Sequence, residues 1–139
     1  MTEKEIIDEV LNALKTDFDA THEVALYPDK PEPNGYVLQH PNGAILVSGA
    51  DITSGQPNMR QQVDMVGIEI TLYIKSLNAP SGITETSDLI RTTLSGLWLG
   101  GMFHFYQVTR SNPEYDFENE YWIRGLMFMS PQIYKMGDD

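Results

Sequence analysis

A run of strictly alternating side chains in the middle of the chain constrains the fold most. Between Val66 and Lys75, apolar residues occupy every second position, and polar or small residues fill the positions between them. A period of two is that of a β-strand, whose successive side chains point to opposite faces of a sheet. The apolar set is Val66, Ile68, Ile70, Leu72 and Ile74, and the other set is Gly67, Glu69, Thr71 and Tyr73. The pattern therefore predicts a strand with one face in the core.

Two segments have helical periodicity instead. From Glu3 to Phe18, apolar residues recur three or four positions apart behind a possible capping box at Thr2 and Glu5, which predicts an amphipathic helix. A second helix is expected to start after Ser81, as its N-cap, and to end at Gly100-Gly101. Its apolar face comprises Ile83, Ile90, Leu94, Leu97 and Trp98. Two helices with one apolar stripe each need a sheet to pack against.

Further strands are predicted on both sides of the second helix, and Pro41-Asn42-Gly43 is a turn signal. They are His22–Tyr27, Ala44–Ser48, Phe103–Arg110 and Phe117–Met129, and Tyr36–His40 is a further extended segment. The order is α-β-β-β-α-β-β, and the 139 residues suit a single domain, 1–139. We predict an α+β two-layer sandwich with both helices on one face of a mainly antiparallel sheet.

Two surfaces are candidates for contacts with other molecules. Gly49–Gln62 has almost no periodicity and predicts a long exposed loop, which either reaches a neighbouring subunit or is merely mobile. Aromatic residues are expected on the sheet face away from the helices. This face either packs against another subunit or is covered by a loop of its own chain. A third alternative is that the predicted strand register is wrong by one residue, which would place these side chains on the other face. The predicted interface residues are Gln56, Asn58, Met59, Arg60, Tyr73, His104, Tyr106 and Tyr121.

The sequence carries no recognisable catalytic or ligand-binding motif. It has no cysteine, no His-Glu-x-x-His pair, and no glycine-rich loop that opens a helix to hold a phosphate. The densest group of possible metal ligands is Asp17, Asp19, His22 and Glu23, and such a group at a helix-to-strand turn is usually solvated surface. We therefore predict no catalytic, cofactor or metal site, and a protein that is not an enzyme.

The charge balance bears on the kinds of partner. Twenty Asp+Glu against nine Lys+Arg give a formal net charge of −11, which repels phosphate backbones and disfavours sequence-specific nucleic-acid binding. The acidic surface serves solubility, or it lines a passage through which nucleic acid slides; charge alone does not separate these interpretations. No apolar run approaches the roughly 20 residues of a membrane helix, and the polar start is unlike a signal peptide, so we expect a cytoplasmic protein.

Several stretches, in order along most of the chain, resemble the tail terminator (tail completion) proteins of Mu-like contractile-tailed phages and prophages. They are His40-Pro41-Asn42-Gly43-Ala44-Ile45-Leu46-Val47, the alternating strand Val63–Ile74, the helix before Gly100-Gly101, and Phe117–Tyr134 with Met129-Ser130-Pro131. The resemblance implies a hexameric ring on the end of the tail tube, which stops polymerisation of the tube and presents a surface for joining the head. The implied partners are further copies of the chain, the tail tube protein and a head–tail connector protein, with DNA passing through the ring. It also implies assembly in the host cytoplasm and a final location in the virion tail, and it brings no active-site residues and no cofactor.

Two other functions remain open at this stage. One is another small phage component, such as a head–tail connector or a baseplate subunit, because such proteins share small α+β folds. The other is a small-ligand-binding protein or enzyme, which predicts a deep pocket with converging polar groups, with Asp17–Glu23 as the candidate region.

Overall fold

The computed structural model describes residues 3–30, 32–58, 61–97 and 105–135. Within these ranges it describes the side chains of all residues except 51–58, 61–65 and 131–135. The elements in chain order are α1 (Glu3–Phe18), β1 (Glu23–Leu26), β2 (Gly43–Asn58), β3 (Gln61–Ile74), α2 (Ile83–Gly96), β4 (Tyr106–Arg110), β5 (Glu114–Asp116) and β6 (Tyr121–Lys135). The predicted α+β class and element order are confirmed, with the short strand β5 added before the last strand.

The strands form one mixed sheet in the order β1-β2-β3-β6-β4, and β5 pairs with the beginning of β6. Only the first of these pairings is parallel: β1 runs alongside β2 with Val24 opposite Ile45. The other pairings are antiparallel, with Val47 opposite Ile70 and Ile70 opposite Leu126. The prediction of a mainly antiparallel sheet is therefore correct.

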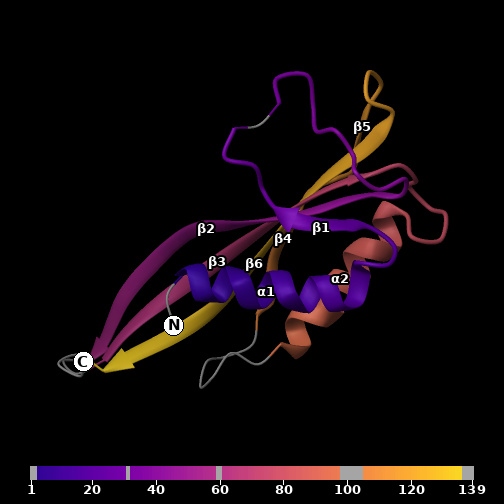
Figure 1. The fold of residues 1–139 in the computed structure, drawn as a ribbon. Helices are drawn as coiled ribbons and strands as arrows, with labels where there is room; N and C mark the ends of the chain where they lie inside the picture. Colours follow the sequence, from indigo (N-terminus) through magenta and orange to yellow (C-terminus); the bar gives the residue numbers. More distant parts are fainter. Residues whose placement is uncertain (1–2, 31, 59–60, 98–104, 136–139) are drawn as a thin grey trace.

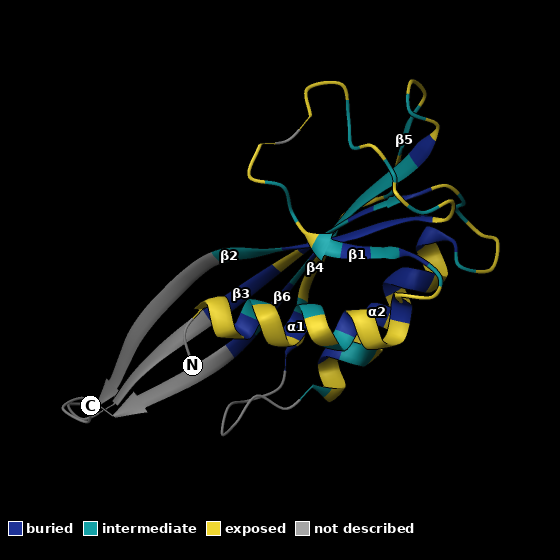
Figure 2. Ribbon diagram, viewed as in Figure 1, coloured by how far each residue is buried: buried dark blue, intermediate teal, exposed yellow. Residues whose placement is uncertain are grey.

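Both helices lie against the same face of this sheet (Figure 1). Helix α1 packs on β1 and β2, and α2 packs on β3, β6 and β4. The hydrophobic core lies between the two layers (Figure 2). It contains the apolar side of β3, where Ile70 and Leu72 are fully buried, and the apolar faces of both helices. The helix residues in it are Ile6, Val10, Leu14, Phe18, Ile83, Ile90 and Leu94. Burial of these two stripes gives each helix most of its stability.

Strands β2, β3 and β6 continue past the helix layer as a three-stranded arm (Figure 1), in which residues 51–58, 61–65 and 131–135 pair. The first turn of α1 lies over the base of the arm, since a Cβ at Gly49 would meet Glu3 and Ile7. The predicted loop Gly49–Gln62 is therefore wrong: its residues belong mostly to the β2–β3 hairpin. Irregularities between Ala50 and Thr53 and between Gly55 and Asn58 interrupt the ladder. Such irregularities break the period of two by which a strand is recognised in a sequence.

The start of α2 also differs from the prediction. The N-cap is Gly82, without a side-chain capping bond, and Ser81 precedes it with φ +64°. This left-handed conformation is uncommon for a residue with a side chain. The Ser81 carbonyl accepts a hydrogen bond from His22 Nε2 at 3.0 Å, so it joins the end of α1 to the start of α2.

The last strand begins later than predicted, at Tyr121, because the segment before it is a turn. The Asp116 carboxylate accepts hydrogen bonds from the backbone N–H groups of Glu118 and Asn119, at 3.0 and 3.1 Å. An aspartate that binds the backbone two residues ahead is a typical turn former. The strand then runs to Lys135, six residues beyond the predicted end at Met129.

Candidate interaction surfaces

The sheet face away from the helices is covered at one end by the chain between β1 and β2. Tyr36 from this connection stacks on Tyr73 with ring centroids 5.3 Å apart, and Tyr73 in turn meets the edge of Tyr121 at 5.2 Å. Leu46 beneath them is fully buried, and Tyr121 is 1% exposed. A loop over this sheet face, one of the alternatives left open by the sequence, is therefore present at this end of the sheet. Tyr73 and Tyr121, predicted as interface residues, belong here to the packing of their own chain.

Hydrogen bonds fix the connection in place. The Tyr36 hydroxyl donates to Glu23 Oε2 at 2.7 Å, and burial together with this carboxylate raises the pKa of Tyr36. Asn119 Nδ2 donates to the Asn34 carbonyl at 2.8 Å. Gly35, at φ +107°, allows the close approach, because a Cβ there would lie 2.3 Å from Asn119 Nδ2. The connection between β1 and β2 is therefore tied both to β1 and to the turn before β6.

We expect Tyr36→Phe to lower the free energy of unfolding by about 1–2 kcal/mol. The change keeps the stack on Tyr73 and removes a hydrogen bond to a charged acceptor. Urea unfolding measures the loss, and hydrogen exchange should be faster in residues 32–41. Tyr106→Phe is the matched control, because Tyr106 is 48% exposed. Equal effects of the two substitutions would show that the bond to Glu23 does not hold this connection.

The rest of this sheet face is not covered in the same way. Glu69 is exposed and Met127 and Met129 are partly exposed, beside the edge strand β4. On that strand, Tyr106 is 48% and Val108 43% exposed, and Tyr106 lies opposite Met129. Of the three predicted interface residues whose side chains the structure describes, Tyr106 is the most exposed. An edge strand with half-exposed apolar side chains is a typical site for pairing with another chain.

The other predicted interface residues are located only in part. Gln56 and Asn58 belong to β2, with Asn58 opposite Gln61, but their side chains lie outside the described part of the chain. Met59, Arg60 and His104 lie outside the described residues altogether. A contact of these five residues with a neighbour stays a prediction.

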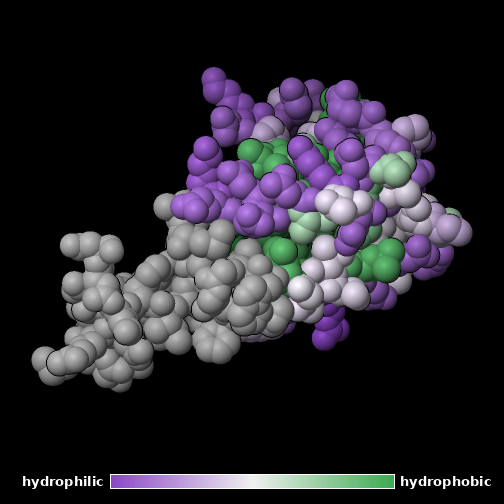
Figure 3. All heavy atoms as spheres, turned by 60° about the horizontal axis from the view of Figure 1, so that its bottom comes forward, coloured by the Kyte–Doolittle hydropathy of each residue, from purple (hydrophilic) through white to green (hydrophobic). Residues whose placement is uncertain are grey.

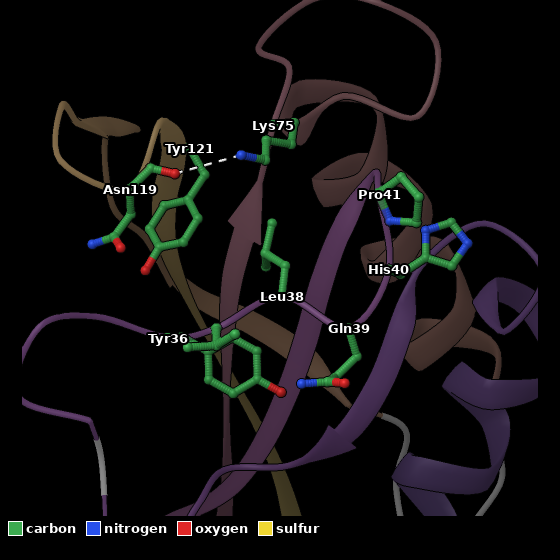
Figure 4. Close-up of a pocket in the computed structure, with 9 residues that line it drawn as sticks. Tyr36, Leu38, Gln39, His40, Pro41, Lys75, Asn119 and Tyr121 are labelled. Carbon is green, nitrogen blue, oxygen red and sulfur yellow. Dashed lines mark hydrogen bonds between the residues drawn. The ribbon is translucent and has the colours of Figure 1, made fainter.

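A groove of about 520 Å³ lies where the covering connection meets the ends of β3 and β6 (Figure 4). Tyr121 and Asn119 line one side, His40 and Pro41 the other, and Leu38 lies between them. Lys75 closes one end, and its ammonium donates to the Asn119 carbonyl at a long 3.5 Å. Sequence reasoning did not find this groove, because its walls come from three segments that only the folded chain brings together.

The possible metal ligands Asp17, Asp19, His22 and Glu23 do not converge. Asp17 accepts a bond from Thr93 on α2, Glu23 binds Tyr36, and His22 is buried between Thr21 and Ser81. Burial lowers the pKa of His22 below its ordinary value of 6.5, which favours the neutral ring. Among the described residues, no group of three or more His, Asp or Glu side chains could hold a metal ion.

Two arginines join α2 to strands β4 and β6. Arg110 on β4 forms an ion pair with Asp88 on α2 at 2.8 Å. Arg124 on β6 donates to the Ser111 carbonyl at 2.7 Å and to Ser87 Oγ at 3.2 Å. Burial, and then the positive charge of Arg110, lower the pKa of Arg124. These cations serve the packing of the domain. The part of the surface that Figure 3 colours by hydropathy is largely hydrophilic, with hydrophobic residues in small patches.

Comparison with known families identifies the class of protein: the chain is a phage protein. A family model described as Gp37 protein matches residues 10–122, and the chain belongs to this family. A search of curated proteins found no match. Neither helix of the described chain is long and apolar enough to cross a membrane.

Proposed function

We propose that this chain is a structural, non-enzymatic phage protein that forms a ring of six copies on the end of the tail tube. The ring stops polymerisation of the tube protein and provides the surface to which the head–tail connector binds. It assembles in the host cytoplasm, remains in the virion tail, and lets DNA pass through a lumen whose acidic residues do not retain it. Membership in a phage family and the resemblance of the sequence to tail terminators support this role.

The three-stranded arm is the observation that carries the proposal. Helix α1 covers β2 as far as Gly49, and the three strands continue beyond it. A sheet is stable when at least one face is buried against another layer. In a ring, a neighbouring copy supplies that layer, and the exposed edge strand β4 offers a second contact surface.

Native mass spectrometry over a range of concentrations tests the ring, and electron microscopy of tail tubes incubated with the protein tests capping. We expect a species of six copies, and tubes of uniform length with density at one end. The double variant Tyr106→Ser, Val108→Ser should lose the six-copy species, because it removes the half-exposed apolar side chains of β4.

Thr92→Ala is the matched control, since Thr92 is exposed and its hydroxyl donates to a carbonyl of its own helix. A protein that stays monomeric at high concentration and leaves tubes uncapped would contradict the proposal. Density at the head-proximal connector or in the baseplate, instead of at the tube end, would favour one of those neighbouring phage components.

A further inference from the structure

The two strands at the ends of the sheet order each have an unpaired outer side. In the order β1-β2-β3-β6-β4, β1 pairs only with β2, and β4 pairs only with β6. Among the described residues, no backbone hydrogen bond links either strand to a segment on its outer side. A strand in this position presents a row of free N–H and C=O groups, which can pair with a strand of another chain.

The alternation of the backbone identifies groups that point outward at each edge. Tyr27, directly after β1, donates its N–H to a carbonyl of β2 at 2.8 Å. Because successive residues of a strand direct their N–H and C=O groups to alternate sides, those of Leu26 point away from β2. Ser111, directly after β4, donates its N–H to a carbonyl of β6 at 3.0 Å, so the groups of Arg110 point away from β6. Each edge therefore offers both a donor and an acceptor.

The side chains of the two edges are compatible with each other. Leu26 on β1 is 52% exposed, and Tyr106 and Val108 on β4 are 48% and 43% exposed. The only charged residue of β1 is acidic, Glu23, and that of β4 is basic, Arg110, so pairing of the two edges sets no like charges against each other. Both charged side chains already have a partner in their own chain. The backbone groups and the apolar side chains therefore carry the contact.

The strand directions also fit a contact between the two edges. Strands β1, β2 and β6 run one way, and β3 and β4 run the other way. Copies in a ring are related by rotation, so in a ring with strands along its axis, β4 of one copy lies antiparallel to β1 of the next. Antiparallel pairing is the more stable kind. A closed ring needs two different complementary surfaces on each copy, and the two edges provide them.

We infer that β4 of one copy pairs antiparallel with β1 of the next copy, so that the sheets of all copies join into one continuous sheet around the ring. This interface rests on the proposed ring of six copies. Leu26 of one copy packs there with Tyr106 and Val108 of its neighbour. The assembled ring then has no open sheet edge, which removes the tendency of such edges to aggregate.

Crosslinking between introduced cysteines tests this contact without background, because the chain contains no cysteine of its own. A short bis-maleimide should join copies of the double variant Leu26→Cys, Val108→Cys into a ladder of products of up to six chains. The two single variants are the matched controls and should give no product between copies, because each edge meets the other kind of edge. A mixture of the single variants should give products of two chains and no longer ones.

A proline tests the backbone hydrogen bond itself. Leu26→Pro removes the outward N–H of β1 and leaves the bonds to β2 in place, since proline is tolerated at an edge position whose N–H points away from the sheet. Leu26→Ala loses the same apolar side chain and keeps the N–H. We expect Leu26→Pro to weaken association in native mass spectrometry by about tenfold more than Leu26→Ala does. Thermal unfolding of both variants identifies any loss that is due to misfolding.

The outcomes separate this interface from the ring itself. A six-copy species that gives no ladder and is unaffected by Leu26→Pro would overturn the edge pairing and leave the ring proposal standing. A crosslinked dimer of Val108→Cys alone would also overturn it, because β4 would then pair with β4 about a twofold axis. A ladder from a chain that shows no six-copy species would contradict the ring of six and support the pairing.

Discussion

Replacing Gly43 with alanine is expected to lower the free energy of unfolding by about 3–5 kcal/mol, a large part of the stability of a typical domain. Gly43 begins β2 with φ +139°, a conformation that residues with a side chain rarely adopt. A Cβ there would lie 2.3 Å from the Tyr73 carbonyl oxygen and 2.7 Å from Ile74 Cα. Both are backbone atoms of the paired strand, so the strain cannot be relieved by turning a side chain.

Urea unfolding followed by circular dichroism measures this loss. Gly96→Ala is the matched control: Gly96 ends α2, and a Cβ there would meet nothing within 4 Å. Alanine has the higher helix propensity, so this control should leave stability unchanged or raise it by up to about 1 kcal/mol. A Gly43→Ala protein as stable as the control would mean that the start of β2 does not pack against β3 as described.

The second large effect is expected at His22, and it depends on pH. The ring is 2% exposed, Nε2 lies 3.0 Å from the Ser81 carbonyl, and Nδ1 lies 2.9 Å from the Thr21 hydroxyl. Replacement by alanine leaves a cavity and removes the shorter hydrogen bond to the Ser81 carbonyl, whose other donor, Thr86 Oγ1, lies 3.5 Å away, so His22→Ala should lower the free energy of unfolding by about 2–4 kcal/mol.

The sign of the pH dependence follows from the lowered pKa of His22. The unfolded chain takes up the proton first, near pH 6.5, so acid stabilises the unfolded state until the folded ring is protonated too. The contribution of His22 is therefore complete above pH 6.5 and is lost as the pH falls through the lowered pKa of the folded state. Unfolding free energies measured from pH 7.5 downwards should show this slope.

His22→Gln separates the titration from the packing. Its amide N–H can replace the donor to Ser81 but does not titrate, so the variant should lose the slope while keeping more stability at pH 7.5 than His22→Ala. An identical slope in His22→Gln and the unaltered chain would show that the pH dependence does not come from His22.

Local patterns predicted the core of this fold well. Helix α1 has the predicted bounds Glu3–Phe18, and the alternating run from Val66 to Ile74 is a strand whose even-numbered residues are buried. Pro41-Asn42-Gly43 leads into β2 as expected, with the positive φ at the glycine. These predictions are correct because each pattern depends on residues only a few positions apart. The same neighbouring residues determine the local secondary structure.

Other elements could not be found in this way. Residues Gly49–Asn58 of the predicted loop belong to strand β2, because backbone hydrogen bonds to β3 form despite the low β-propensity of Gly, Pro and Asn. Ser81 has a capping sequence but serves instead as an acceptor for His22, a residue 59 positions earlier in the chain. In both places a distant contact overrode the local preference.

The sequence alone determined the fold class and the strand with alternating side chains from Val66 to Ile74. It also determined the acidic charge of the chain and the lack of a recognisable catalytic motif. Only the tertiary structure decided which surfaces remain available to a partner. It placed Tyr73 and Tyr121 beneath the chain between β1 and β2, left Tyr106 on an open edge, and extended the sheet beyond the helices. The groove around Lys75 arises in the same way, since its walls come from three segments. The physical reason is that periodicity reports which side of an element is apolar, whereas the identity of what covers that side depends on contacts between residues far apart in the chain.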